Sequence, residues 1–387
     1  MPVFQTARAR RACVLMCLIA FLQGFVLYAP VAALYRTGAG LTLTQIALLE
    51  SLSYVLTVAL EVPLGALCAR IGYKRMLVLV NFVFFASKLV FWRAYGFGMF
   101  LAERVLMSVV SAGLSGCDDA YLYLAAGPEE AQRAFGRYSV SGTVGLLASS
   151  AAFTLLFSDA WRAAALWTAV FYGAAAACAL ALPDAPASKA DRAPLAAQLR
   201  GIADNLRAQP RVGLLLAADV LLTISGQTVT VFYSQLLYKR CGVPDAWLGA
   251  LYVLLTLCAL SAGASWRAAR HLKKRFGPCV FLLGAAGCFA AGFARGPVLC
   301  AAGVFALQFA WYAWQPYSAR LQNDSVADGA RSVILSGYSM AQNLGTSGLS
   351  LALGAVADVQ LTGALALAGG LCALGAALAA RYVRRAA

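Results

Sequence analysis

Long apolar windows, separated by short polar or charged loops, run along the whole chain of 387 residues. The hydrocarbon core of a bilayer is about 30 Å thick, and a helix needs roughly 20 apolar residues to cross it. Windows of that length, bounded by charged or Gly/Pro-containing loops, predict twelve spanning helices. They cover residues 12–35, 44–68, 76–91, 99–125, 138–157, 163–182, 212–238, 246–266, 278–294, 298–319, 332–357 and 363–380. The pattern therefore predicts an all-α integral membrane protein.

Composition supports the same fold class. Hydrophobic residues make up 61% of the chain, charged residues 12%, and the mean hydropathy is +0.74. A soluble domain has about 45–50% apolar and about 25% charged residues. The 11 cysteines lie almost entirely inside predicted spans, and none forms a CxxC pair. We therefore expect neither a disulfide framework nor a metal site.

The formal net charge of +15 is explained by topology. Most Lys and Arg residues fall at the two termini, in the central linker and in the loops after the even-numbered spans, which is the distribution expected of cytoplasmic segments. We expect both termini in the cytoplasm of a bacterial cell, a protein embedded in the inner membrane, and no nucleic-acid partner. The first 35 residues have some features of a secretory signal, but the apolar run is too long for one, so we expect no cleavage.

The longest polar interval, residues 183–211, divides six spans from six. We predict an N-terminal bundle at 1–182, a cytoplasmic linker at 183–211 and a C-terminal bundle at 212–387. Within the linker, residues 193–208 fit an amphipathic helix on the membrane surface or a solvated segment equally well. A short basic loop follows the second span of each half, at 70–75 and at 267–277, which indicates internal duplication.

One of these loops carries a motif. Gly65, Arg70, Gly72, Lys74 and Arg75 resemble the Gly-x-x-x-Asp-Arg-x-Gly-Arg-Lys loop of the major facilitator superfamily, although Ala69 stands where the motif has Asp. Residues 115–120, 135–137 and 331–336 resemble a bacterial branch of that superfamily. The resemblance implies two six-helix bundles, alternating access, and a cavity lined by the first, fourth, seventh and tenth spans. It implies a gating role for the loop, while a role in topology alone explains its basic residues equally well.

Ionisable side chains inside the spans are candidates for function, because a charge facing lipid costs a few kcal/mol or more. They are Glu50, Glu61, Lys88, Glu103, Arg104, Asp118, Asp119 and Asp219. We expect a structural ion pair between Glu50 and Lys88, with Glu103 and Arg104 in the same cluster. Glu61, near a proline, is expected to accept hydrogen bonds from helix N-termini or from the basic loop.

Polar residues also recur at helical spacing in four spans. The stripes are Gln23 and Tyr28; Arg104, Ser108, Ser111, Ser115 and Asp118 or Asp119; Asp219, Thr223, Gln227, Thr230 and Ser234; and Gln308, Trp311, Tyr312, Gln315 and Ser318. Steps of three and four residues place each stripe on one helical face. We predict that these faces line the cavity and that Asp119, Gln227 and Trp311 contact substrate. Hydrogen bonding between helices is the alternative.

Asp118 and Asp119 are adjacent carboxylates that cannot both ionise cheaply away from water. We predict that they bind the coupling proton, with Arg104 or Asp219 modulating their charge.

The acid excess and the aromatic residues of the tenth span favour proton-driven export of a hydrophobic or cationic small molecule by a monomer that needs no cofactor. The fifth span lacks the Gly-Pro element usual in antiporters of the superfamily, so a proton-coupled importer stays open, as does a membrane sensor. Neither an enzyme nor an ATP-driven pump is expected, because His271 is the single histidine and no Walker loop is present.

Overall fold

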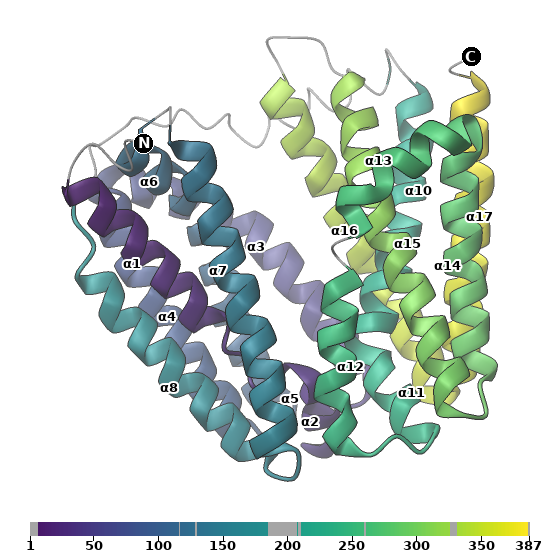
Figure 1. Cartoon of the computed structure of the whole chain (residues 1–387), viewed down its shortest axis with the longest axis horizontal. Helices are drawn as coiled ribbons and strands as arrows, with labels where there is room; N and C mark the ends of the chain where they lie inside the picture. The colour runs from purple at the N-terminus through teal and green to yellow at the C-terminus, as the bar shows by residue number, and fades with distance from the viewer. Residues whose placement is uncertain are drawn as a thin grey trace. The chain divides into compact units, whose positions relative to one another are not determined.

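The computed structural model describes residues 7–115, 117–127, 130–184, 207, 210–258, 261–325 and 331–385. Helices are the only regular elements in these ranges (Figure 1). Most of the predicted linker at 183–211, including the segment 193–208, lies outside the described residues.

The predicted spans correspond to single helices or to short series of helices. In the first half these are α1 (Ala7–Gly24), η1 (Ala29–Val31), α2 (Ala32–Gly38), α3 (Leu43–Ile71), α4 (Tyr73–Arg93), α5 (Gly96–Leu114), α6 (Cys117–Ala126), α7 (Ala131–Ala152), η2 (Phe153–Phe157) and α8 (Trp161–Leu180). In the second half they are α10 (Pro210–Gln227), η3 (Thr228–Tyr233), α11 (Ser234–Arg240), α12 (Asp245–Leu257), α13 (Ser261–Leu272), η5 (Lys273–Arg275), α14 (Phe276–Phe293), α15 (Pro297–Asp324), α16 (Arg331–Val359) and α17 (Leu361–Arg385).

Within the described residues, 10 segments are long and apolar enough to cross a membrane. They coincide with ten of the twelve predicted spans. The other two predicted spans fall on α12 with α13 and on α16, so their membrane crossing stays a prediction.

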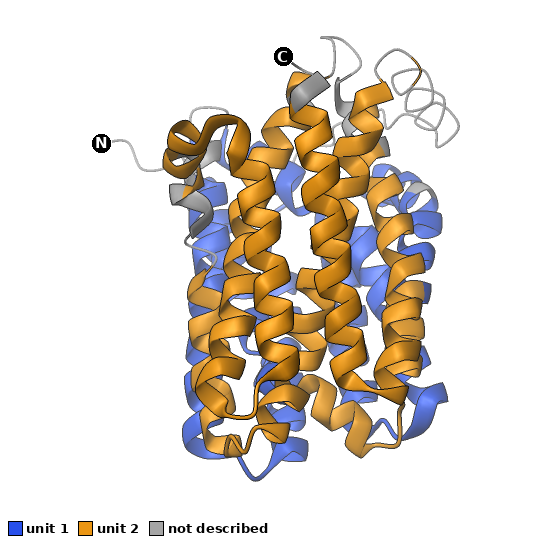
Figure 2. Cartoon of the chain, turned by 90° about the vertical axis from the view of Figure 1, so that its right-hand side faces the viewer, with its two compact units in different colours: residues 1–31, 52–192 blue, residues 32–51, 193–387 orange. Residues whose placement is uncertain are grey.

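The helices form two compact units, coloured separately in Figure 2. Unit 1 contains residues 1–31 and 52–192, and unit 2 contains residues 32–51 and 193–387. The segment 32–51 therefore groups with the second half, whereas the predicted N-terminal bundle includes it.

Hydrogen bonds explain why 32–51 belongs to unit 2. Gln235 Oε1 accepts from the backbone N–H of Ala33 over 2.9 Å. The carboxylate of Asp358 accepts from the backbone N–H groups of Leu43 and Thr44, at 2.6 and 2.9 Å. The first N–H groups of a helix have no partner within the helix, so Asp358 caps the start of α3.

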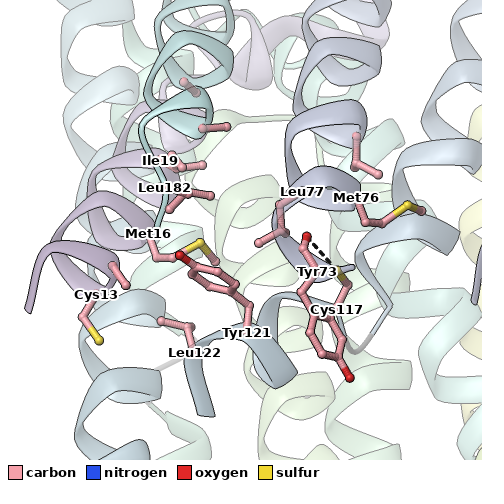
Figure 3. Close-up of a cluster of buried hydrophobic side chains, with 14 of the residues drawn as sticks. Cys13, Met16, Ile19, Tyr73, Met76, Leu77, Cys117, Tyr121, Leu122 and Leu182 are labelled. Atoms are coloured by element: carbon pink, nitrogen blue, oxygen red, sulfur yellow. Dashed lines mark hydrogen bonds between the residues drawn. The ribbon is translucent and has the colours of Figure 1, made fainter. Parts of the chain in front are cut away.

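Unit 1 is held by a buried apolar cluster contributed by α1, α4, α5, α6, α7 and α8. Met16, Met76 and Tyr121 are among its fully buried members (Figure 3). The turn that leads into α4 depends on Gly72, whose φ of 88° lies in the left-handed region that favours glycine. This turn places Tyr73, the first residue of α4, against the cluster.

Candidate functional site

In unit 2, Asp219 of α10 lies at the centre of a buried polar network. Its side chain is 7% exposed. Trp314 of α15 donates its indole N–H to Oδ1 over 2.6 Å, and Gln342 of α16 donates to Oδ2 over 2.6 Å. Ser318 also hydrogen-bonds to the carboxylate. Among the described residues no Lys or Arg pairs with Asp219, so this carboxylate is held by neutral donors alone.

The neighbouring turns of α15 present buried polar atoms that have no hydrogen-bond partner among the described residues. Gln308 is 7% exposed. In the described part of the chain, neither its Oε1 nor Nε1 of Trp311 has a hydrogen-bond partner, although both are buried. Trp311 stacks on Tyr312 with ring centroids 5.5 Å apart, and Gln315 reaches Thr223 Oγ1 at 3.5 Å. Of the predicted stripe on the tenth span, Gln315 and Ser318 therefore hydrogen-bond to α10, and Gln308 and Trp311 carry buried atoms able to bind a ligand.

The predicted stripe of the seventh span is altered by a π-helical stretch, η3. Thr230 Oγ1 donates to the carbonyl of Gly226, and Ser234 Oγ donates to the carbonyl of Thr230, each over 2.7 Å. Gln227 stands at the start of η3. π-helical turns inside α-helices occur frequently at functional sites. Sequence periodicity did not predict η3, because the prediction assumed a constant α-helical repeat.

In unit 1, Lys88 of α4 is 5% exposed and lies among aromatic rings. Its Nζ donates to the hydroxyl of Tyr28 over 3.1 Å and lies 5.0 and 5.1 Å from the ring centroids of Phe84 and Tyr172. Glu103 is near enough to interact with it electrostatically. The lysine charge is thus stabilised by cation–π contacts, a hydroxyl and a carboxylate.

The predicted ion pair between Glu50 and Lys88 would join the two units, so it stays a prediction. Glu50 Oε1 lies 3.2 Å from Nη1 of Arg36, and these side chains are 14% and 4% exposed. Glu50 belongs to unit 2 and Lys88 to unit 1. Of the predicted cluster, Glu103 lies with Oε2 3.2 Å from Nε of Arg104 and interacts electrostatically with Lys88.

A second polar contact in unit 1 joins the first and third spans. Gln23 Nε2 donates to Asn81 Oδ1 over 2.8 Å, and the hydroxyl of Tyr172 donates to the backbone carbonyl of Gln23 over 2.6 Å. A cavity of about 380 Å³ borders Gln23, Tyr138 and Tyr172. Asn81 and Tyr172 were not predicted, although an asparagine inside an apolar span is a signal that the sequence offers.

The predicted stripe of the fourth span is not one continuous helical face. α5 ends at Leu114, and α6 begins at Cys117. Ser108, fully buried, hydrogen-bonds to Ser53 of α3, whereas Ser111 is exposed. Ser115 is the C-cap residue of α5, through its backbone N–H. The interruption between α5 and α6 separates Arg104, Ser108 and Ser111 from Asp118 and Asp119. The prediction of a single continuous helical face is therefore wrong.

Asp118 and Asp119 occupy the first turn of α6. Asp118 Oδ1 accepts from the backbone N–H of Asp119 over 2.9 Å, and its Oδ2 accepts from the hydroxyl of Tyr138 over 3.3 Å. Asp119 is exposed and borders a cavity of about 330 Å³ together with Tyr73 and Phe135. The two carboxylates therefore have different environments, because Asp118 is hydrogen-bonded and Asp119 is exposed to the cavity.

The motif loop lies between α3 and α4. Glu61 and Gly65 are half-buried on α3, Arg70 lies in its last turn, and Arg75 is exposed. Lys74 lies 3.5 Å from the carboxylate of Asp184. This ion pair joins the loop to the end of the sixth span.

Comparison with known proteins bears on the whole chain. A family model described as Major Facilitator Superfamily matches residues 13–350. A bacterial homologue of the human lysosomal transporter Spinster, solved inward-facing and unoccupied, has a TM-score of 0.77 at 15% identity, with 98% of each chain covered. A point mutant of the nucleoside transporter NupG has a TM-score of 0.75 at 14% identity, with 97% of this chain and 98% of that chain covered. A point mutant of the peptide transporter POT has a TM-score of 0.74 at 12% identity, with 100% and 99% covered. None of the curated proteins matches.

Proposed function

The chain belongs to the Major Facilitator Superfamily, and we propose that it couples proton movement to the export of a hydrophobic or cationic small molecule. The proposed cycle is alternating access across the bacterial inner membrane, with both termini in the cytoplasm. The site that carries this proposal is Asp219 with its neutral donors. An intramembrane carboxylate that pairs with no Lys or Arg of the described residues is suited to binding and releasing a proton.

The partners of Asp219 allow two protonation states with different bonding. An indole N–H can only donate, so Oδ1 accepts from Trp314 in both states. Gln342 carries both a donor and an acceptor on its amide. When Asp219 is ionised, the Gln342 amide donates to Oδ2, as in the structure. When Oδ2 is protonated, the amide turns and accepts instead, so protonation rearranges the contact between α10 and α16.

We also propose Asp118 and Asp119, in the first turn of α6, as a second place where protons bind, with Arg104, which is held by Glu103, as a modulating charge. Asp118 accepts hydrogen bonds from Tyr138 and from the Asp119 backbone N–H, whereas Asp119 is exposed.

For the substrate we propose contacts with the unbonded face of α15. Gln308 Oε1 needs a donor and Trp311 Nε1 needs an acceptor, so a bound molecule that offers both would satisfy these atoms. The stacked rings of Trp311 and Tyr312 supply a surface for an apolar or cationic group. The other proposed substrate contacts are Gln23, Tyr28, Ser111, Ser115, Gln227, Thr230 and Gln315.

Proton flux during transport tests the proposal. The full chain is reconstituted into vesicles that contain a pH-sensitive dye, and an amphiphilic cation such as ethidium is supplied with a proton gradient. We expect counterflow of protons and ethidium in the wild type and none coupled in Asp219→Asn. Asp324→Asn, an exposed carboxylate at the end of α15 in an i,i+4 ion pair with Arg320, is the matched control.

Three results would contradict the proposed function. Unchanged coupling in Asp219→Asn would remove this carboxylate from the mechanism. Protons and substrate moving in the same direction would make the protein an importer, and radiolabelled uptake with and without the gradient would measure that directly. Binding without any flux would favour the sensor.

A further inference from the structure

Helices α1 and α7 of unit 1 are in backbone contact near one end. Gly24 closes α1, and a Cβ atom there would collide with the carbonyl oxygen of Gly142. A Cβ atom on Gly145 would likewise collide with the carbonyl oxygen of Phe21. Close approach of two helices in a membrane depends on such small residues. The crossing is therefore fixed at Gly24 and Gly145.

Toward the N-terminal ends of the same helices there is a cavity of about 700 Å³ between them. Val14 and Cys17 of α1 and Val140 and Ser141 of α7 line it, and both valines are largely exposed. Ligand cavities in proteins typically measure about 300–1,000 Å³. We call this cavity the α1/α7 groove.

The groove is lined mainly by apolar side chains and is basic at one end. Arg137 of α7 belongs to the lining, and its guanidinium is close enough to the Cys13 thiol to interact with it electrostatically. Arg10 is exposed and lies four residues before Val14, so both project from the same face of α1. Two arginines therefore flank the end of the groove at which both helices begin, and the glycine contact closes the other end.

We propose that the α1/α7 groove binds one anionic phospholipid, with an acyl chain along Val14 and Val140 and the phosphate between Arg10 and Arg137. Guanidinium groups match phosphate oxygens in charge and in hydrogen-bond geometry. A zwitterionic lipid has the same acyl chains but no net charge on its headgroup. A cationic amphiphile is repelled by the two arginines. The groove belongs to unit 1 and the network around Asp219 to unit 2, and lipid binding does not depend on which cargo is transported.

Lipid retention measures the site directly. The purified full chain in neutral detergent is titrated with dioleoylphosphatidylglycerol or dioleoylphosphatidylcholine, and bound lipids are counted by native mass spectrometry. Each basic residue near an anionic lipid surface contributes about a fivefold change in affinity. We expect the anionic lipid to bind about 25-fold more tightly, and Arg137→Gln and Arg10→Gln each to lower that preference about fivefold.

Further variants separate the groove from general surface charge. Val140→Trp fills the groove and keeps both arginines, so it should reduce retention of both lipids, and Val14→Trp repeats the test from the opposite wall. Arg137→Lys should retain the preference, and Arg93→Gln, an exposed arginine at the end of α4, should leave it unchanged.

The opposite results would overturn the proposal. An anionic preference that survives the Arg10→Gln/Arg137→Gln double variant would place the lipid elsewhere. Undiminished retention in both tryptophan variants would show that the acyl chain does not occupy the groove. Inorganic phosphate that displaces the lipid at equal concentration would show recognition by the arginines alone.

Discussion

Trp314 on α15 and Asp219 on α10 are joined by a hydrogen bond of 2.6 Å between the indole Nε1 and Oδ1. The contact is buried, and the ring of Trp314 also packs edge-on against Phe281, with centroids 4.9 Å apart. One side chain thus fixes the carboxylate and fills the core of unit 2. Substitutions can separate the two roles.

Trp314→Phe keeps an aromatic ring and removes the donor. A hydrogen bond to a charged group contributes about 1.5–3 kcal/mol, so we expect unfolding in detergent to become easier by about that amount. Proton coupling should weaken as well, because Oδ1 loses its fixed donor. Tyr312→Phe removes a polar group from the same helix without touching Asp219 and is the control. Equal stability losses in the two variants would show that the Asp219 contact is energetically unimportant.

A second prediction concerns the ion pair of Arg36 and Glu50, which is largely buried. Removing one partner of a buried pair costs about 3–5 kcal/mol, because a buried charge is left uncompensated, whereas replacing both by apolar residues is often neutral. We expect Arg36→Leu to be strongly destabilising and the Arg36→Leu/Glu50→Leu double variant to regain most of the loss. Chemical unfolding of the single and double variants measures the coupling. If the two single effects simply add, the residues act independently.

The sequence was sufficient to find Lys88, Glu50 and Asp219, because a charge inside an apolar window is visible without a structure. It was not sufficient to pair them. Glu50 binds Arg36, which lies on the short helix α2 after the first span, and the rotation of that helix is not encoded in hydrophobic periodicity.

Local departures from the α-helical repeat were also missed. The predicted stripe of the fourth span assumed an unbroken helix, but α5 stops at Leu114, and η3 changes the register of the seventh span. Ser and Gly near position 115 are compatible with both a continuous helix and a break, so the packing of the helix determines which of the two forms. The ten helices that are long and apolar enough to cross a membrane, in contrast, could be predicted from length and hydropathy alone.

A third prediction tests the aromatic enclosure of Lys88. Tyr28→Phe keeps the ring that stacks on Phe91 at 4.0 Å and removes only the hydroxyl that accepts from Nζ. The loss of a hydrogen bond to a buried charge should lower the free energy of unfolding by about 1.5–3 kcal/mol. Tyr95→Phe, at a well-exposed tyrosine of the same unit, should change it by less than about 0.5 kcal/mol. A Tyr28→Phe protein as stable as Tyr95→Phe would mean that cation–π contacts and Glu103 alone hold the lysine.

The cap on α3 predicts a dependence of stability on pH. Asp358 lies just beyond the predicted eleventh span, which ends at Ala357. Partial burial by itself raises the pKa of Asp358, but the hydrogen bonds from Thr44, Leu43 and Thr42 outweigh burial, so its pKa lies below the ordinary value for Asp.

A carboxyl group whose pKa is lowered by folding stabilises the fold above its unfolded pKa, about 3.9, and loses that contribution as the pH falls through the folded pKa. Asp358→Ala should therefore destabilise the protein near pH 7 by about 0.5–2 kcal/mol, the range for loss of an N-cap. The difference between wild type and variant should stay constant down to about pH 4 and shrink below it. Thermal unfolding in detergent from pH 7 to pH 3 measures this difference, which isolates Asp358 from the other carboxylates. Asp324→Ala, at an exposed carboxylate in the last turn of α15, should show no such convergence, and a gap between wild type and Asp358→Ala that widens in acid would contradict the assigned cap.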